Sequence, residues 1–132
     1  MNAPREIVRV RTVMEEGFDT VDGMSTIAHA LEQMQHRTSR CLVVRKRHDD
    51  DEHGLLLLSD IARKVLAANR SPNRVNVYEV MAKPVICVDA TMDIRYCAQL
   101  FNRFSITRAP VVENGEVIGV VSFTELVLRG MR

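Results

Sequence analysis

Two stretches of the sequence place hydroxyl side chains and a carboxylate at the end of a short apolar run. They are residues 54–61, GLLLLSDI, and residues 119–126, GVVSFTEL. The apolar run predicts a buried strand, and a Ser or Thr followed by an acid is typical of a helix start. A strand that passes directly into a helix leaves backbone N–H groups and a partial positive charge at the junction. A carboxylate there can accept hydrogen bonds from a vicinal diol such as a ribose.

The second junction also has a purely structural interpretation. Ser122 and Glu125 have the S-x-x-E spacing of a capping box, which closes a helix N-terminus without any ligand. The two interpretations of this copy stay open. At the first junction Leu57 cannot act as a cap, so Asp60 has no such partner, and we therefore regard Asp60 as the better of the two candidate acids.

A loop of charged residues gives a third candidate for chemistry. Residues 48–53, HDDDEH, place two imidazoles around four carboxylates, which are ligands that Zn²⁺ or another divalent ion accepts. Three basic residues precede the run and can neutralise it, and consecutive charges in a turn usually form a solvated loop. We expect no metal site. The spacing of Ser, Cys, His and Asp residues shows no catalytic triad, and no glycine-rich phosphate loop follows a predicted strand, so we expect no enzyme.

Charge and composition exclude several partners. The 132 residues include 18 Lys and Arg against 17 Asp and Glu, for a net charge of +1. This balance gives no reason to expect nucleic acid or an anionic membrane as a partner. No apolar run approaches the roughly 18 residues of a membrane span, and residues 1–6 lack the apolar region of a secretory signal. Three cysteines without a CxxC pair favour reduced thiols, and we expect a cytoplasmic protein.

The elements that must position the two junctions are repeated along the chain. V-x-x-V-M occurs at residues 10–14 and 77–81, an offset of 77 − 10 = 67. Apolar residues at i, i+3, i+4 and i+7 then follow from Ile27 and from Ile94, as expected for one face of a helix. Arg40 and Arg108 immediately precede the next apolar segments at an offset of 68, and the junction glycines match at 119 − 54 = 65. The shifts fall where loops are expected.

The repeats predict an α/β (α+β) fold with two halves. We place the first repeat and an N-terminal segment at residues 1–70, a polar linker at 71–76 and the second repeat at 77–132. Each half is expected to contain a helical turn, an extended segment, an amphipathic helix, two strands and a closing helix. Asn114-Gly115 between apolar runs is a strong hairpin signal. A half of this size buries little surface alone, so we expect the halves to pack about a pseudo-two-fold axis.

The whole chain from about Val10 to Leu128 resembles a tandem pair of CBS domains, often called a Bateman module. The resemblance rests on the two V-x-x-V-M openings, on residues 109–112 and on the two glycine–strand–acid junctions. It implies β-α-β-β-α order in each repeat and a cleft for adenosine-containing ligands such as AMP, ADP, ATP or S-adenosylmethionine. It also implies a regulatory module that catalyses nothing, requires no cofactor and commonly forms a homodimer.

The family pattern is Gly, two apolar residues, Ser or Thr, two variable residues and Asp, where the acid binds the ribose hydroxyls. Asp60 fits this pattern, with Leu57 at the hydroxyl position and Ser59 as a substitute; Ser122 fits it too, with Glu125 in place of Asp. The ligand-binding residues that the resemblance implies are Asp60, Ser59, Gly54, Arg40, Arg63, Thr20, Val21, Ser122, Thr124, Glu125, Arg108, Pro110 and Ile86. The arginines are expected near phosphate, although each also fits a solvated surface cation, and Thr20, Val21 and Ile86 are expected near adenine.

The sequence thus predicts a sensor that binds an adenosine nucleotide between the repeats and signals to a separate target protein through a change of shape. The alternative is a dimerising scaffold whose degenerate pockets bind nothing. Leu57 and Glu125 favour the alternative, because both depart from the family pattern.

Overall fold

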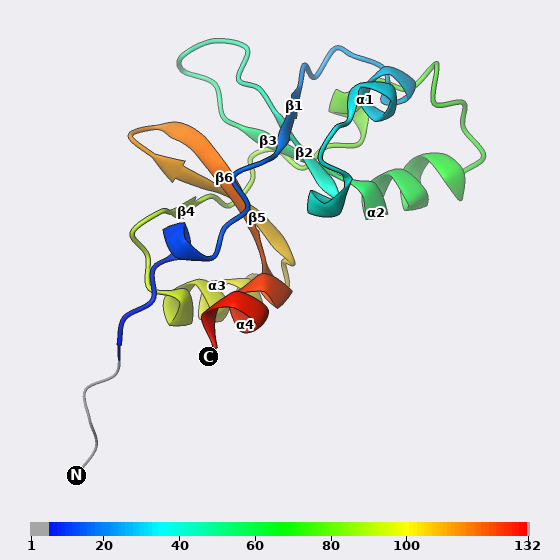
Figure 1. Cartoon of the computed structure of the whole chain (residues 1–132). Helices are drawn as coiled ribbons and strands as arrows, with labels where there is room; N and C mark the ends of the chain where they lie inside the picture. Colours follow the sequence, from blue (N-terminus) through cyan, green and yellow to red (C-terminus); the bar gives the residue numbers. More distant parts are fainter. Residues whose placement is uncertain (1–5, 132) are drawn as a thin grey trace. The chain divides into compact units, whose positions relative to one another are not determined.

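The computed structural model describes residues 6–131 and confirms the mixed α and β fold. Among these residues it contains two three-stranded sheets and four α-helices (Figure 1). The chain divides into two compact units. We call Gly17–Val85 the contiguous unit, and residues 6–16 together with 86–131 the split unit.

The sheet of the contiguous unit has the order β1-β2-β3. Its strands are β1 (Asp19–Val21), β2 (Cys41–Val44) and β3 (Gly54–Leu57); β1 is parallel to β2, and β3 is antiparallel to it. Helix α1 (Ile27–Gln33) connects the two parallel strands, as a parallel crossover requires. Helix α2 (Leu58–Ile61) follows β3 directly and continues into a π-helical segment, Ala62–Leu66. The predicted strand-to-helix junction is therefore present.

The split unit repeats this order. Its strands are β4 (Val88–Asp89), β5 (Arg108–Glu113) and β6 (Glu116–Ser122), and its helices are α3 (Ile94–Phe104) and α4 (Phe123–Gly130). The predicted Asn114-Gly115 hairpin is confirmed, since both residues have positive φ angles of 52° and 80°. Helices α3 and α4 contact each other below the sheet (Figure 1).

Each unit has a hydrophobic core of its own. In the split unit Phe101 is fully buried and its ring lies 5.9 Å from that of Phe123, centroid to centroid. In the contiguous unit the four residues of β2 are all buried. Side chains cap α1 and α3: Thr26 Oγ1 accepts a hydrogen bond from the backbone N–H of His29, and Asp93 Oδ1 accepts one from that of Arg95.

The opening turn of each repeat packs against the sheet of the other repeat. The 3-10 turn Val10–Thr12 belongs to the split unit, where the N–H of Arg11 donates to the carbonyl of Ala90 at 2.9 Å. The turn Val77–Glu79 belongs to the contiguous unit, where the N–H of Tyr78 donates to the carbonyl of Gly23 at 2.9 Å. The units in space therefore differ from the repeats in sequence, whose boundaries we placed at 1–70, 71–76 and 77–132.

The segment that the sequence suggests as a linker, residues 71–76, is part of the contiguous unit. The carbonyls of Pro72 and Val75 accept hydrogen bonds from the N–H groups of Ala28 and Ile27 at 2.9 and 2.8 Å, and Val75 is buried. This segment thus satisfies two of the free N–H groups at the start of α1.

Gly119 lets the N-terminal segment approach β6 closely. The backbones of Glu15 and Val120 exchange two hydrogen bonds, at 2.8 and 3.0 Å. A Cβ atom on Gly119 would lie only 2.7 Å from the carbonyl oxygen of Glu15 and 2.7 Å from the sulfur of Met14. In this chain the junction glycine therefore serves the packing of residues 6–16.

We expect Gly119→Ala to lower the free energy of unfolding by about 1–3 kcal/mol, because the added methyl overpacks a backbone contact. Urea denaturation followed by circular dichroism measures this change. Gly23→Ala is the matched control, since a Cβ there lies 3.6 Å from Val44 Cγ1 and meets ordinary contact only. Equal stabilities of the two variants would contradict the role assigned to Gly119.

Candidate functional site

The Asp60 junction combines a carboxylate with a guanidinium at the start of α2. Arg63 Nη2 donates to Asp60 Oδ1 at 2.7 Å, and the two side chains are 68% and 17% exposed. The N–H of Leu58 donates to the carbonyl of Arg40 at 3.1 Å. Within the described residues Oδ2 of Asp60 has no hydrogen-bond partner. The junction therefore offers one open carboxylate oxygen beside an exposed cation.

Three of the predicted site residues lie close to Asp60 along the chain or through the backbone. Ser59 precedes it and is exposed, and Arg63 is its ion-pair partner. Arg40 has an exposed side chain and a left-handed φ of 59°, and its carbonyl binds the first N–H of α2. The structure thus brings Ser59, Arg40 and Arg63 to one junction.

Gly54 and Val21 lie at the other end of the same sheet. Gly54 pairs with Val44, whereas Leu57, next to α2, pairs with Cys41. Val21 also pairs with Val44. The exposed Thr20 accepts a hydrogen bond through Oγ1 from Arg45 Nη1 at 3.0 Å. Because the strands extend roughly 3.3 Å per residue, Gly54 and Val21 lie about 10 Å along the sheet from the α2 junction.

The strand register corrects the sequence match between the arginines. Arg108 is the first residue of β5 and pairs with Ser122, as Cys41 pairs with Leu57 in the other unit. The equivalent of Arg40 is Thr107, whose carbonyl accepts from the N–H of Phe123 at 2.8 Å. The offset therefore stays at 67 up to the start of the strand. Aligning Arg40 with Arg108 gives the wrong offset of 68. That alignment relies on one pair of identical residues, and the strand pairing that fixes the register is not visible in the sequence.

The second junction is occupied by its own side chains. Ser122 Oγ accepts from the N–H of Glu125 at 3.1 Å and lies 3.2 Å from Thr124 Oγ1. This is the cap that S-x-x-E predicts. The carboxylate of Glu125, however, pairs with Arg129 Nε at 2.8 Å, and Arg129 also donates to the carbonyl of Met14 at 3.2 Å.

Two other predicted residues of the split unit lie on its strands or just before them. Pro110 is buried in β5 opposite Val120. Ile86 is half-buried and precedes β4. Neither presents a polar side chain, so any role in binding would come from packing against a ligand or from its backbone.

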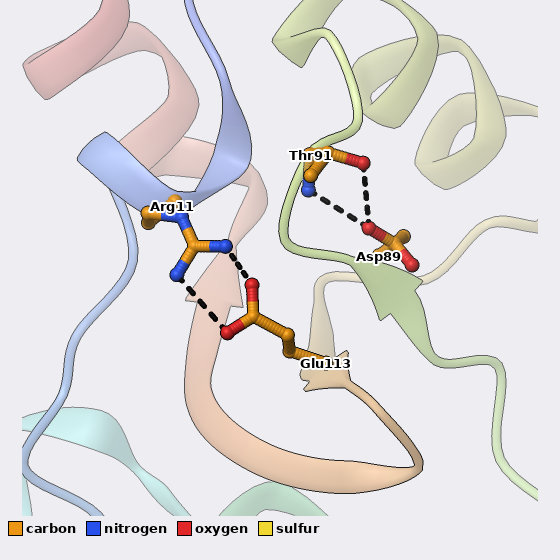
Figure 2. Close-up of polar contacts among 4 residues, drawn as sticks. All are labelled: Arg11, Asp89, Thr91 and Glu113. Atoms are coloured by element: carbon orange, nitrogen blue, oxygen red, sulfur yellow. Dashed lines mark hydrogen bonds and ion pairs between the residues drawn. The ribbon is translucent and has the colours of Figure 1, made fainter.

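The far end of the sheet in the split unit is closed by polar contacts. Figure 2 shows Arg11 paired with Glu113 and Asp89 turned toward Thr91. Asp89 Oδ1 accepts from the N–H and the hydroxyl of Thr91 at 2.9 and 2.7 Å. These two bonds, together with the nearby charge of Arg11, hold the pKa of Asp89 below its usual range.

A sequence model of the CBS domain matches residues 10–67 and 77–131. The chain belongs to the CBS domain family. It is a CBS domain pair, and CBS domain pairs are regulatory modules.

Solved structures and a sequence relative agree with this assignment. The hexameric CBS-CP12 protein from bloom-forming cyanobacteria superimposes with a TM-score of 0.89 and 31% identity, over 95% of this chain and 72% of that chain. The CBS domain pair of MJ0100, in complex with 5-methylthioadenosine and S-adenosyl-L-methionine, shares the fold at 21% identity and a TM-score of 0.77, over 96% and 100% of the two chains. MK0525 of Methanopyrus kandleri is 26% identical over 82% of this chain, which spans only 56% of that relative.

One carboxylate of the acidic loop, residues 48–53, forms an ion pair and a hydrogen bond with other residues of the contiguous unit. Asp51 Oδ2 pairs with Lys83 Nζ at 2.7 Å and accepts from the N–H of Arg47 at 2.9 Å. In residues 6–131 no three His, Cys, Asp or Glu side chains converge as metal ligands. No helix of that range is long and apolar enough to cross a bilayer. Both ring nitrogens of His53 are buried without a hydrogen-bond partner.

We expect replacement of His48 and His53 by alanine to leave the fold and ligand binding unchanged, because neither imidazole joins a set of metal ligands. Metal analysis of the purified protein and thermal melting of both forms measure the effect. Loss of a bound metal together with a melting temperature several degrees lower would contradict this expectation.

Proposed function

We propose that this CBS pair senses an adenosine-containing nucleotide, which binds at the Asp60 junction, and that it signals to a separate target protein through a change of conformation. The observation that carries the proposal is the Asp60–Arg63 pair at the start of α2, with one carboxylate oxygen open. The second repeat, in contrast, uses its acid in an ion pair with Arg129.

The chemistry of the pair fits a ribose whose substituent carries an anionic group, such as a phosphate or the carboxylate of S-adenosylmethionine. An ionised carboxylate is an acceptor only, and a ribose diol supplies two donors. Oδ2 of Asp60 accepts one hydroxyl, and Oδ1 has a second lone pair beside its bond to Arg63. The exposed guanidinium has further N–H donors for a phosphate oxygen. The ligand class is therefore AMP, ADP, ATP or S-adenosylmethionine, and the complex of MJ0100 supports it at the level of the fold.

Neighbouring side chains extend the same site. Ser59 and Arg40 are exposed beside the start of α2 and supply a hydroxyl and a second guanidinium. We assign Ser122, Thr124 and Glu125 a weaker role, because the contacts of Ser122 and Glu125 already cap and brace α4. One ligand per chain is the expected stoichiometry.

Thermal melting with AMP, ADP, ATP and S-adenosylmethionine tests the proposal. A ligand at 100 times its dissociation constant that binds only the folded protein adds about 2.7 kcal/mol to the free energy of unfolding. If none of the four ligands shifts the melting temperature at millimolar concentration, the result contradicts the nucleotide sensor and supports a second candidate function. That candidate is a dimerising scaffold, and the engaged side chains of the second junction favour it.

We expect the CBS pair to form a homodimer. Val127, Leu128 and Met131 at the end of the split unit are 53%, 69% and 72% exposed. Val127 and Met131 line a mostly apolar groove of about 640 Å³ beside α3 and α4, and Leu128 follows Val127 on α4. An exposed apolar face of this kind typically marks a contact with another protein surface. Sedimentation at tens of micromolar measures the oligomeric state, and Leu128→Glu is expected to shift it toward monomer. A wild-type monomer would contradict the expectation.

A further inference from the structure

The contiguous unit has a pocket at the end of its sheet that lies away from Asp60. The pocket has a volume of about 300 Å³, and its lining includes Val44 at the end of β2 and Arg45 and Arg47 just after it. Val44 pairs with Gly54, whereas Asp60 comes three residues after Leu57, which pairs with Cys41. The pocket and the Asp60 junction are therefore separated by the length of β2, roughly 10 Å.

Three cations line this pocket together with three large side chains. The cations are Arg45, Arg47 and Lys83, and the others are Met24, Tyr78 and Met81. Tyr78 and Met24 are 50% and 56% exposed. A small hollow that joins guanidinium groups to an aromatic ring fits a compact anion with a planar apolar part.

Contacts with neighbouring residues hold two of the cations in place. Arg45 Nη1 donates to Thr20 Oγ1 at 3.0 Å, and Lys83 Nζ pairs with Asp51 Oδ2 at 2.7 Å. The hydrogen bonds from Lys83 and from the N–H of Arg47 keep the pKa of Asp51 well below its usual range. Asp51 thus neutralises one of the three positive charges, and Lys83 retains two N–H donors for another acceptor.

The backbone fixes the apolar side of the pocket. The N–H groups of Val77 and Tyr78 donate to the carbonyls of Ser25 and Gly23 at 2.8 and 2.9 Å. The turn that carries Tyr78 is therefore bonded to the segment that carries Met24. The ring and the cations lie on separate elements whose relative positions are set before any ligand arrives, which lowers the entropic cost of binding.

The split unit shows what this end of the sheet contains when it is closed. Arg11 occupies the position of Tyr78, since its N–H donates to Ala90 as that of Tyr78 donates to Gly23. Glu113, on β5, forms an ion pair with Arg11 across the end of the sheet (Figure 2). The contiguous unit has an aromatic ring in place of the arginine, and cations follow its β2. The open pocket is thus a difference between two otherwise similar units.

We propose that this pocket binds a phosphate monoester of a small planar molecule, independently of the Asp60 junction. Arg45, Arg47 and Lys83 bind the phosphate oxygens, because guanidinium groups match them with paired N–H donors. The planar part lies against Tyr78 and Met24, where stacking and burial of apolar surface add to the affinity. The CBS pair then has two ligand sites with different chemistry in one unit.

Amide NMR titration of the full chain with phenyl phosphate tests the proposal. We expect shifts at residues 23–24, 45–47 and 78–83, and the double variant Arg45→Gln, Arg47→Gln is expected to weaken binding by about tenfold or more. Lys46→Gln is the matched control, because it removes a charge from the same loop without lining the pocket. It should change the affinity by less than about twofold. Asp60→Ala should leave phenyl phosphate binding unchanged, which separates this site from the proposed nucleotide site.

A second variant tests the apolar side of the pocket. Tyr78→Leu is expected to weaken phenyl phosphate and to leave the weaker binding of inorganic phosphate unchanged, because inorganic phosphate has no ring. The same spectra report whether each variant is folded. If the double variant does not fold, the single variant Arg47→Gln is used in its place. The proposal is overturned if Lys46→Gln loses as much affinity as the double variant, if the shifts centre on Asp60, or if phenyl phosphate causes no shifts at about 10 mM, where even weak sites fill.

Discussion

Asp60→Ala is expected to weaken the binding of an adenosine nucleotide by about tenfold or more. Asp60 supplies the carboxylate that meets the ribose diol, and each charge-assisted hydrogen bond contributes about 1.5–3 kcal/mol. A loss of about 1.4 kcal/mol corresponds to a factor of ten in the dissociation constant. Isothermal titration calorimetry with the nucleotide that gives the largest thermal shift measures the change. Asp60→Asn should lose nearly as much, because it keeps the size of the side chain and removes its charge.

A ligand analogue shows whether the loss comes from the ribose contact. The 2′,3′-dideoxy nucleotide is expected to bind the wild type weakly and to lose little more with Asp60→Ala, because both changes remove the same interaction. Glu125→Ala is the matched control from the other repeat. Since Glu125 pairs with Arg129 on α4, its replacement should affect stability more than binding. Normal binding by Asp60→Ala together with lost binding by Glu125→Ala would show that the second junction is the site.

Phe101→Ala is expected to lower the free energy of unfolding by about 3–5 kcal/mol. Phe101 is fully buried on α3, where it packs against Phe123 at the start of α4. Its removal leaves a cavity between the two helices of the split unit, and packed interiors relax into such cavities only in part. Chemical denaturation of the full chain measures the loss. If the two units unfold separately, the transition of the split unit is the one that should move.

Phe104→Ala on the same helix is the matched control. Phe104 is 51% exposed, and its ring lies 5.7 Å from the guanidinium carbon of Arg103. Its removal gives up a surface contact of about 0.5–1 kcal/mol and creates no cavity. Similar losses from the two substitutions would show that the core of the split unit is not organised around Phe101.

Much of the fold follows from local sequence patterns. The apolar spacing from Ile94 predicts a helix, and Ile94, Cys97 and Phe101 are buried in α3. The Asn114-Gly115 pair predicts its hairpin, because the turn needs two positive φ angles that these residues adopt readily. Such features depend on neighbours within a few residues, so one sequence is enough to find them.

The features that the sequence does not predict depend on contacts between distant residues. The V-x-x-V-M turns mark the repeats correctly, yet nothing in their composition shows that Val10 and Val77 pack on the sheet of the other repeat. The pocket at the end of β2 was missed for the same reason. In the sequence, residues 45–47 are recognisable as a basic run that can neutralise the acidic loop. Tyr78 and Lys83 lie beside this run only in the folded unit.

At the Asp60 junction the sequence predicts the residues better than their arrangement. Asp60 and Arg63 are three residues apart, and their side chains meet on the helix as this spacing allows. Gly54 belongs to the same motif but lies at the other end of β3, where its missing side chain admits the backbone of Ala82. A motif that is continuous in sequence therefore serves two separate places in the fold.

The position of residues 6–16 in the split unit sets the order of events on the ribosome. Residues 17–85 leave the exit tunnel as one uninterrupted piece, so the contiguous unit can close while the second half of the chain is still being made. Residues 6–16 are made before the other part of the split unit, yet Glu15 has no Val120 to pair with until that residue has been made. The contact of Arg129 with Met14 spans 115 residues and cannot form before residue 129 has been made. Residues 6–16 therefore lack their partners in the split unit while residues 17–85 are made, and chaperones and neighbouring chains have access to them during that time.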